Sequence, residues 1–540
     1  MMGSRFRRAV KVLAENARSK DVELDRRSMS SWGRLSSTSG ADGFPWVNAR
    51  YIPEHYDPPA PPTKDNSLGV PSQRHWNEEW STADIQQAAE EHVMLSWSNS
   101  KPVKDLPIFE RSEGVYLYDQ HGKRFLDWTS QAVCVNLGYT VPQHIKEAVN
   151  TQLETLPYLY GGLGLAPVRA KLAKLMAEIC PGDLNGFLFP SGGGEANEAA
   201  IRMARLYTGK QKIFTQYRSY HGGSTSSLGA TGDFRRRFAE SNTHGFVKFF
   251  NPQPGGFSWG TTDQSATQRT LSCLEDQILA EGPESIAAIM VESIVGAGGV
   301  LVPPDGYIEG IRGLCDKYDI LMICDEVMVG FGRTGRFFGF QHFEGVIPDI
   351  VTSAKGLTGS FLPLSMVGVR QKIKDYFWEH PVGWGATYHA HPVALACAYE
   401  TVKYMLKEEI VEKVQRLEPV MMQELQALVL KHDSVRQARN VGLFGCLDLQ
   451  NPQGNFVQRL GAPSPPEVQL LRQALRDHGL LALFRPPLLH CCPPLVIQED
   501  QLREGFGMLT KALEVLDREQ QRLYSLDAAG VTVETAAMRT

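Results

Sequence analysis

The chain has 540 residues, of which 42% are hydrophobic and 21% are charged, and its formal net charge is -5 at pH 7. This length predicts two or three domains of roughly 100 to 200 residues each, and the composition is typical of a folded globular protein. The near balance of 55 basic and 60 acidic residues excludes a broad positive surface, so we expect neither nucleic acid nor a membrane as a partner. No apolar run reaches the roughly 18 to 20 residues that span a bilayer, and we expect a soluble protein.

The nine cysteines are scattered along the chain, and no two of them have the C-x-x-C spacing of a redox or zinc motif. We therefore expect reduced thiols in a reducing compartment, and we predict no metal site.

The N-terminal segment is basic: the first twenty residues contain six basic residues and the single acid Glu15. With the Ser-rich stretch from Met29 to Ser39, this segment resembles a mitochondrial presequence and predicts a location in the mitochondrial matrix. The alternative is a disordered basic tail on a cytoplasmic protein, because Asp21, Glu23 and Asp25 break the acid-poor rule. We assign residues 1–75 to a targeting segment followed by an extended Pro-rich arm.

Regular structure is expected from residue 76, with a helix capped by Ser81 and a hairpin over residues 114–128. Between residues 151 and 394, short apolar runs alternate with helical stretches, which predicts a mostly parallel sheet with helices on both faces. Long amphipathic helices and a short strand then indicate a smaller domain. We therefore assign residues 151–394 to a large α/β domain. The other assignments are an N-terminal part of the small domain (76–150), its C-terminal part (395–521) and a loose tail (522–540).

A glycine-rich loop follows the strand-like segment GFLFP and leads into a helix that begins near Glu195. Three consecutive glycines, including Gly193 and Gly194, let backbone N–H groups approach a phosphate at a helix N-terminus without side-chain obstruction. The loop lacks the Lys-Ser/Thr pair of a nucleotide P-loop, and taken alone it is typical of a surface turn.

Asp325 and Lys355 each follow an apolar, strand-like run. Asp325 would lie at the carboxyl edge of a parallel sheet, and a buried acid there requires a cationic partner such as a protonated ring nitrogen. Shelter from water would lower the pKa of Lys355 enough for it to act as a nucleophile and a base. In isolation the acid is typical of a strand-end cap and the lysine of a solvated surface residue. Together with the phosphate loop, they are the three contacts that pyridoxal phosphate requires.

The run from Val291 to Arg370 contains ICDEVMVGFGRTGRFFGFQHFEGVIPDIVTSAKGL, which closely resembles the cofactor signature of class III (omega-amino acid) aminotransferases. Supporting motifs extend the resemblance from about Gly114 to Ile497. The resemblance implies the α/β architecture of PLP fold type I: a large domain with a mostly parallel seven-stranded sheet, and a smaller α+β domain from the N- and C-terminal segments. It also implies pyridoxal 5'-phosphate as the cofactor and a homodimer with sites at the subunit interface.

The resemblance assigns roles around the cofactor ring. Lys355 matches the Schiff-base lysine, and Asp325 matches the acid that pairs with the pyridine nitrogen. Tyr220 and His221 lie in YHGGS, which matches the family's aromatic-His-Gly motif and implies that Tyr220 stacks on the ring. Val327 is then expected to pack against the opposite face.

Other matches concern the phosphate and the substrate. Gly193 and Gly194 match the phosphate loop, and Thr387 in GATYHAHP resembles the threonine that reaches the phosphate from the neighbouring subunit. Arg485 lies before the PPL motif and matches the arginine that meets the acidic group of the substrate. A salt bridge is the alternative for Arg485, and Arg439 is a further candidate for an interdomain contact.

The chain departs from the family at three positions. Gly194 stands where family members usually have Ser or Thr, so more of the phosphate binding is left to backbone amides. Ala297 replaces the glutamate of the four-aminobutyrate and ornithine branches, and Met328 replaces the glutamine often found after Asp-Glu-Val. These features resemble the omega-amino acid:pyruvate branch, which includes taurine and beta-alanine aminotransferases, and they favour pyruvate as the acceptor.

The expected reaction moves an amino group from an omega-amino acid or related amine to an oxo acid, through a Lys355 Schiff base and pyridoxamine phosphate. Donors of the taurine, beta-alanine or 4-aminobutyrate type fit this expectation equally well. Because the cofactor contacts do not fix the reaction, an aminomutase or a decarboxylase of the same fold is an alternative. A non-catalytic scaffold is disfavoured, since the lysine, the acid and the aromatic residue are all retained.

Overall fold

The computed structural model describes residues 79–96, 100, 106–238, 244–252, 264–459 and 462–528. The expected presequence and arm lie outside these residues. Residues Ser81–Thr540 form one compact unit, distinct from Met1–Trp80, and the description below concerns the former. Within the described ranges, no helix combines the length and the apolar character needed to cross a membrane.

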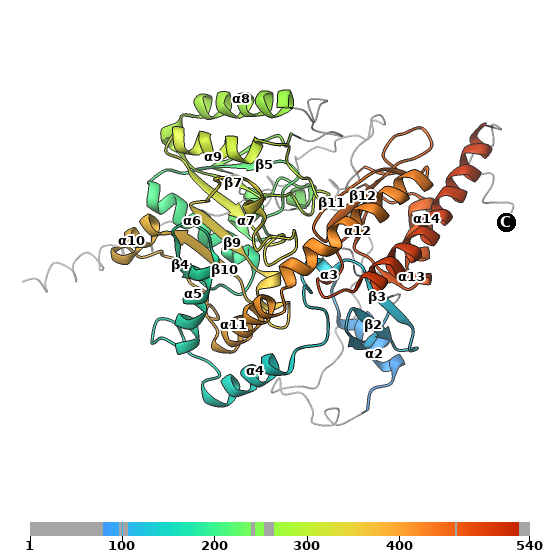
Figure 1. Cartoon of the computed structure of the whole chain (residues 1–540), viewed down its shortest axis with the longest axis horizontal. Coiled ribbons are helices and arrows are strands. Elements are labelled where there is room, and N and C mark those ends of the chain that lie inside the picture. Colours follow the sequence, from blue (N-terminus) through green and yellow to red (C-terminus); the bar gives the residue numbers. More distant parts are fainter. Residues whose placement is uncertain are drawn as a thin grey trace, which may run out of the picture. The chain divides into compact units, whose positions relative to one another are not determined.

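The largest element is a seven-stranded sheet with the order β4-β10-β9-β8-β7-β5-β6 (Figure 1). Neighbouring strands are parallel except where β10 pairs antiparallel with β4 and with β9. The predicted mostly parallel sheet is therefore confirmed. Its strands are β4 (Leu184–Leu188), β5 (Lys212–Gln216), β6 (Phe246–Phe249), β7 (Ile286–Val291), β8 (Leu321–Asp325), β9 (Ile350–Ser353) and β10 (Met366–Arg370).

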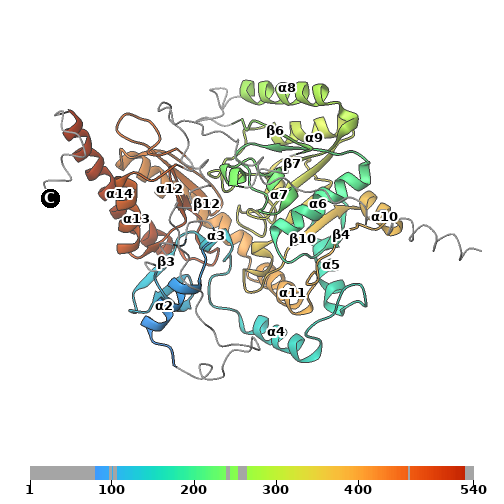
Figure 2. The same cartoon turned by 180° about the vertical axis from the view of Figure 1, so that it is seen from behind.

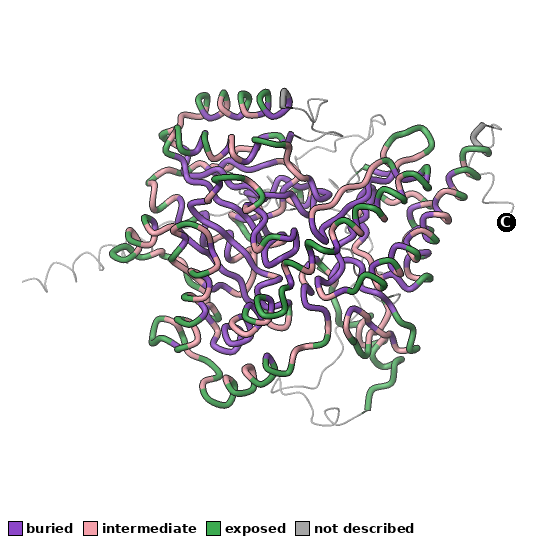
Figure 3. Tube along the Cα trace, viewed as in Figure 1, coloured by how far each residue is buried: buried purple, intermediate pink, exposed green. Residues whose placement is uncertain are grey.

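The central strands are continuous apolar runs because helices cover both faces of the sheet. All residues of β7 and β8 are buried. Met290 and Ile323 belong to one core with the alanine-rich helix α6 (Gly193–Thr208), whereas Ile289 and Met322 belong to another core with α9 (Tyr307–Lys317). Alternate side chains of each strand thus face opposite helical layers, and Figure 3 shows the sheet buried between them.

The other helices of this part surround the sheet, with α8 beside α9 in both views (Figures 1 and 2). They are α4 (Gln143–Thr155), α5 (Pro167–Ile179), α7 (Thr225–Ala230), α8 (Gln264–Glu281), α10 (Gln371–Glu379) and α11 (Pro392–Lys407). Short 3-10 turns are η4 (Phe234–Phe238), η5 (Pro283–Ser285), η6 (Gly339–His342) and η7 (Lys355–Thr358).

Two four-stranded sheets form the smaller part. The first has the order β1-β2-β3-β13, and β13 pairs parallel with β3, so segments from both ends of the unit share one sheet, as expected. The second has the order β11-β12-β15-β14, with α12 packed against β11. The strands are β1 (Phe109–Glu113), β2 (Tyr116–Asp119), β3 (Arg124–Asp127), β11 (Val435–Val441), β12 (Phe444–Leu449), β13 (Leu480–Leu481), β14 (Phe484–Arg485) and β15 (Leu488–Cys491).

The helices of the smaller part are α2 (Thr82–His92), α3 (Ser130–Val133), α12 (Ile410–Lys431), α13 (Pro466–Asp477) and α14 (Glu499–Ala528). Helix α2 begins as predicted, because the Ser81 hydroxyl accepts the Asp84 N–H at 3.2 Å and the Asp84 carboxylate accepts the Ser81 N–H at 2.9 Å. The predicted hairpin is formed by β2 and β3. Helix α14 continues to Ala528, so the tail expected from residue 522 is helical at its start.

Candidate active site

Apart from Thr387 and Arg485, the predicted residues lie at or after the carboxyl ends of strands in the large sheet. The glycine loop follows β4, Tyr220 and His221 follow β5, Asp325 ends β8 and Lys355 follows β9. Because the ends of parallel strands meet at one edge of a sheet, residues far apart in the sequence are brought together there.

Asp325 is buried, with 3% of its surface exposed, and three groups surround its carboxylate. The Asn197 amide donates a hydrogen bond at 2.8 Å, the Val327 backbone N–H donates one at 2.9 Å, and His221 Nδ1 lies 2.7 Å away. These contacts fix the orientation of the carboxylate within the sheet edge. His221 is therefore a direct partner of Asp325, while its Nε2 is buried without a partner among the described residues.

Asn197 is a residue that the sequence reasoning missed. Its amide also donates to the His221 carbonyl at 2.6 Å, and its Oδ1 accepts the Thr352 hydroxyl at 2.7 Å. It thus ties α6, β8 and β9 together at the site. Asn197 could have been found from the sequence, because it is a single amide within the alanine-rich run EANEAA of an amphipathic helix. An amide side chain on the buried face of a helix requires specific hydrogen-bond partners.

Lys355 begins the turn η7 with a φ of 38°, an uncommon conformation for a residue with a side chain. Burial lowers the pKa of its amine, although nearby acids, Asp325 among them, oppose this shift. In the described part of the chain, the amine has neither a hydrogen-bond partner nor an ion-pair partner. A sheltered amine of this kind can act as a nucleophile.

The glycine loop lies directly against the other site segments. A Cβ on Gly193 would lie 2.7 Å from a methyl carbon of Val327, and a Cβ on Gly222 would lie 2.9 Å from the Cα of Gly194. Only glycine therefore fits at these contacts, and the first turn of α6 presents backbone N–H groups beside the loop.

Two hydroxyl groups lie near Gly194, where family members usually have Ser or Thr. A Cβ on Gly194 would lie 3.9 Å from Oγ of both Ser224 and Ser227. Hydroxyls from the segment after β5 are thus placed beside the glycine loop, and these were not predicted from the sequence.

Tyr220 is held by its backbone and covered on one face. Its N–H donates to Glu292 at 2.8 Å, and Glu292 also accepts the Gly296 N–H at 2.8 Å. Burial raises the pKa of Glu292 to about 7. The Arg235 guanidinium lies 3.8 Å from the centre of the Tyr220 ring and pairs with Asp233 at 2.9 Å. Neither Glu292 nor Arg235 was predicted as a site residue.

Arg485 lies in β14, and in the described ranges its guanidinium has no hydrogen-bond or ion-pair partner. Burial, together with the positive charge of Arg235, lowers the pKa of Arg485 to about 10. Arg439, in contrast, pairs with Asp448 at 2.8 Å and donates to the carbonyl of Gly299 in the loop after β7. The contact expected of Arg439 between two parts of the fold is therefore present.

Thr387 is not brought to the glycine loop within one chain. It lies in an exposed segment before α11, and its carbonyl accepts the Tyr158 hydroxyl at 2.7 Å. Among the predicted site residues, Thr387 thus stands apart from the cluster at the sheet edge.

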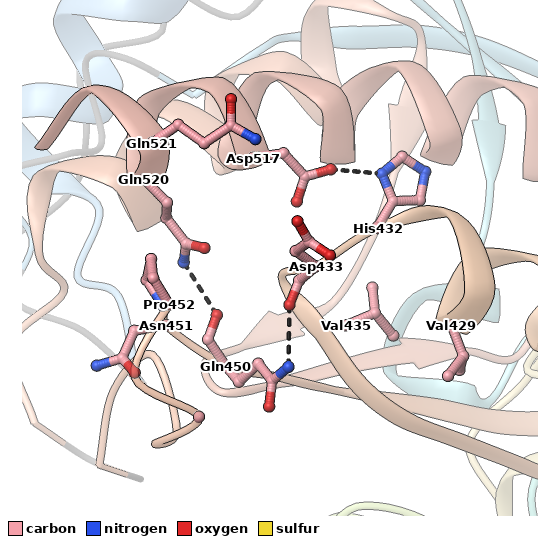
Figure 4. Close-up of a pocket in the computed structure, with 11 residues that line it drawn as sticks. Val429, His432, Asp433, Val435, Gln450, Asn451, Pro452, Asp517, Gln520 and Gln521 are labelled. Carbon is pink, nitrogen blue, oxygen red and sulfur yellow. Dashed lines mark hydrogen bonds and ion pairs between the residues drawn. The ribbon is translucent and has the colours of Figure 1, made fainter. Parts of the chain in front are cut away.

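A separate pocket of about 370 Å³ lies between α12, α14 and the loop after β12 (Figure 4). His432 Nδ1 lies 2.6 Å from Asp517 in its wall, and the pocket shares no residue with the predicted site.

All nine cysteines are free thiols, as expected. Across the described ranges, no group of three or more His, Cys, Asp or Glu side chains is arranged to hold a metal ion.

The sheet-edge residues fit the cofactor expected from the sequence. Lys355 offers an aldehyde an amine that has no partner among the described residues, and Asp325 offers an oriented carboxylate to a ring nitrogen. The glycine loop leaves backbone N–H groups open where any Cβ on Gly193 would collide with Val327. An amine, an acid and a glycine loop at a helix N-terminus are thus present in one region.

Comparisons with known proteins agree with this geometry. The family model described as aminotransferase class-III matches residues 98–513. The putrescine–pyruvate aminotransferase of Pseudomonas aeruginosa is 32% identical over 452 residues, which cover 80% of this chain and 96% of that protein. A taurine–pyruvate aminotransferase of Bilophila wadsworthia is 31% identical over 445 residues, which cover 79% of this chain and 96% of that protein.

A solved structure supports the same assignment. The taurine:2-oxoglutarate aminotransferase of Bifidobacterium kashiwanohense, in complex with PLP and glutamate, is similar with a TM-score of 0.77 and 38% identity, over 82% of this chain and 99% of that chain. The chain therefore belongs to the class III aminotransferase family and is a pyridoxal-phosphate-dependent aminotransferase.

Proposed function

We propose that this aminotransferase moves an amino group from an omega-amine that carries an acidic group, of the taurine, beta-alanine or 4-aminobutyrate type, to pyruvate. The observation that carries this proposal is the half-buried guanidinium of Arg485, which has no anionic partner among the described residues. A carboxylate or a sulfonate would supply the missing bidentate partner.

Pyridoxal phosphate, when bound, supplies an aldehyde that joins the amine and a ring that accepts the electrons released at the substrate carbon. Lys355 would bind the aldehyde and then carry a proton at the substrate carbon, since its lowered pKa suits both tasks. Asp325 would hold the proton of the ring nitrogen, and Asn197 and His221 would orient Asp325. The same side chain therefore serves as nucleophile and base.

Other residues would enclose and anchor the cofactor. Tyr220 would stack on one face of the ring and Val327 would pack on the other, while the backbone amides at Gly193 and Gly194 would bind the phosphate. The Arg235 guanidinium on the far side of the Tyr220 ring would keep that ring in place.

The choice of pyruvate is supported by the region after β7. Ala297 is buried and carries no acid, and a Cβ on Gly296 would lie 2.0 Å from the Met328 sulfur. Met328 therefore fills the space beside this loop. Arg439 is already paired with Asp448, so it is not free to bind a second substrate carboxylate.

A homodimer is supported by an exposed apolar surface around Thr387. Leu163 is 83% exposed and Leu165 and Tyr388 are each 64% exposed, and the rings of Tyr158 and Tyr388 lie 6.1 Å apart. Exposed clusters of this kind mark protein interfaces. A second copy that covers this surface would bring its Thr387 to the phosphate of the first.

We also propose the domain division at residues 150, 394 and 521, and import into the mitochondrial matrix. The pairing of β13 with β3 supports a small domain drawn from both ends of the chain. The basic residues before Asp21 support import. N-terminal sequencing of the mature protein from isolated mitochondria would test the second proposal.

The decisive experiment is a panel of amines with pyruvate and 2-oxoglutarate as acceptors. Taurine, beta-alanine and 4-aminobutyrate should form alanine from pyruvate, whereas putrescine and butylamine should react poorly because they bring no anion to Arg485. Efficient turnover of putrescine would contradict the proposed substrate class. Amine consumption without alanine or glutamate formation would instead indicate an aminomutase or a decarboxylase.

A further inference from the structure

Backbone strain is concentrated around Lys355. Six residues with side chains adopt positive φ angles in three segments that surround it, a rare state for such residues and especially for a β-branched one. These residues are Ser130 (47°), Gln131 (58°), Val133 (57°), Phe331 (60°), Lys355 (38°) and Ser360 (66°). Strain of this kind persists only where neighbouring contacts hold the segments together.

The three segments contact one another directly. The Ser360 hydroxyl donates to the Cys134 carbonyl at 2.7 Å, and the Asn136 amide donates to the Phe331 carbonyl at 3.1 Å. A Cβ on Gly356, the residue after Lys355, would lie 2.4 Å from Asn136 Nδ2 and 2.8 Å from the Phe331 Cβ. The loop over residues 130–136, named the strained loop below, is therefore wedged against the turn that carries Lys355.

One side chain, Arg333, is hydrogen-bonded to the strained loop at two residues. Its Nη2 donates to Ser130 Oγ at 3.0 Å and to Asn136 Oδ1 at 3.1 Å. Its Nη1 donates to the carbonyls of Leu443 at 3.1 Å and Pro493 at 2.6 Å. A single guanidinium thus joins both ends of the strained loop to two segments of the smaller part of the fold.

The electrostatics of Arg333 indicate a role in position rather than in stability. The side chain is fully buried, its four acceptors are neutral, and burial lowers its pKa to about 10. Burying a cation without a hydrogen-bonded carboxylate is unfavourable, so a well-packed apolar residue would serve stability better. A planar guanidinium can meet four separate acceptors at once, whereas a lysine ammonium cannot match that geometry.

We propose that Arg333 is a positioning residue that holds the strained loop against the Lys355 turn and thereby sets the orientation of the Lys355 amine. This inference rests on the proposed role of Lys355. Asn136 and Ser360 transmit the restraint, since Asn136 packs against Gly356 within the turn and Ser360, just after the turn, is hydrogen-bonded to the loop.

Arg333→Lys in the full chain loaded with pyridoxal phosphate tests this proposal. The pH midpoint of the visible absorption of the loaded enzyme should shift by about one unit, and kcat should fall about tenfold with a smaller change in the amine KM. Arg312→Lys is the matched control, because Arg312 is a half-buried arginine in an ordinary pair with Asp349 at 2.8 Å. It should lower thermal stability and leave the midpoint unchanged.

A milder variant keeps the test decisive if Arg333→Lys does not fold. Ser360→Ala removes only the hydrogen bond from the turn to the Cys134 carbonyl, and it should shift the midpoint in the same direction by a smaller amount. A wild-type midpoint and kcat in Arg333→Lys, or in Ser360→Ala where the former does not fold, would reject the proposal. Borohydride reduction should attach the cofactor permanently to Lys355 in each variant. If the wild-type enzyme gave no such attachment, the proposed function would be rejected instead.

Discussion

Asn197 offers the sharpest test of how the fold orients Asp325. Asn197→Ala removes the amide that donates to Asp325 and to the His221 carbonyl, and it leaves the Thr352 hydroxyl without its acceptor. The His221 carbonyl and the Thr352 hydroxyl are then buried without this partner, at a cost of about 1 to 3 kcal/mol each. The free energy of unfolding should therefore fall by roughly 2 to 6 kcal/mol. Urea unfolding followed by circular dichroism would measure this change.

The effect on the cofactor separates orientation from stability. Asp325 would keep His221 and the Val327 N–H but lose one charge-assisted hydrogen bond, worth about 1.5 to 3 kcal/mol. The Kd for pyridoxal phosphate should then rise roughly 10-fold to 100-fold. Thr352→Val is the matched control, since it removes only the hydroxyl that Asn197 accepts. An equal weakening of cofactor binding in both variants would refute the reasoning.

Three further outcomes are expected. Arg485→Leu should lower kcat/KM for beta-alanine by about 100-fold, because the charge-assisted pair with the substrate carboxylate is lost. It should leave kcat/KM for butylamine nearly unchanged. Equal losses for both amines would contradict the role of Arg485 in binding the acidic group. Thr387→Val and Lys355→Ala should each be nearly inactive yet regain activity when unfolded and refolded together, because a mixed dimer contains one intact site; no recovery would argue against sharing. Burial raises the pKa of Glu292 from 4.5 to about 7, so between these pH values the folded state binds a proton that the unfolded state has lost, and stability should fall as pH rises from 4.5 to 7. Glu292→Gln should make the dependence of the unfolding free energy on pH less steep in urea titrations. An unchanged dependence would reject this role of Glu292.

The strands and the principal site residues could be predicted because they follow local rules. Continuous apolar runs such as residues 286–291 encode buried parallel strands, and an acid or a lysine directly after such a run lies at the sheet edge. Asp325 and Lys355 were therefore accessible from the sequence.

The residues that escaped prediction depend on contacts between distant segments. Asn197 finds its hydrogen-bond partners only when α6 packs against β8 and β9. Arg333 lies within the sequence motif attributed to cofactor binding, but its hydrogen-bond partners are residues 130, 136, 443 and 493. Hydrophobic periodicity does not encode such partners. Thr387 is a different case, because it was predicted from the sequence and its proposed contact with the phosphate requires a second chain.

The most direct test of the central claim is borohydride reduction of the loaded enzyme followed by peptide mass spectrometry. The account predicts loss of the visible absorption and a phosphopyridoxyl label on the peptide that contains Lys355. A label on another lysine, or full turnover by Lys355→Ala, would contradict it.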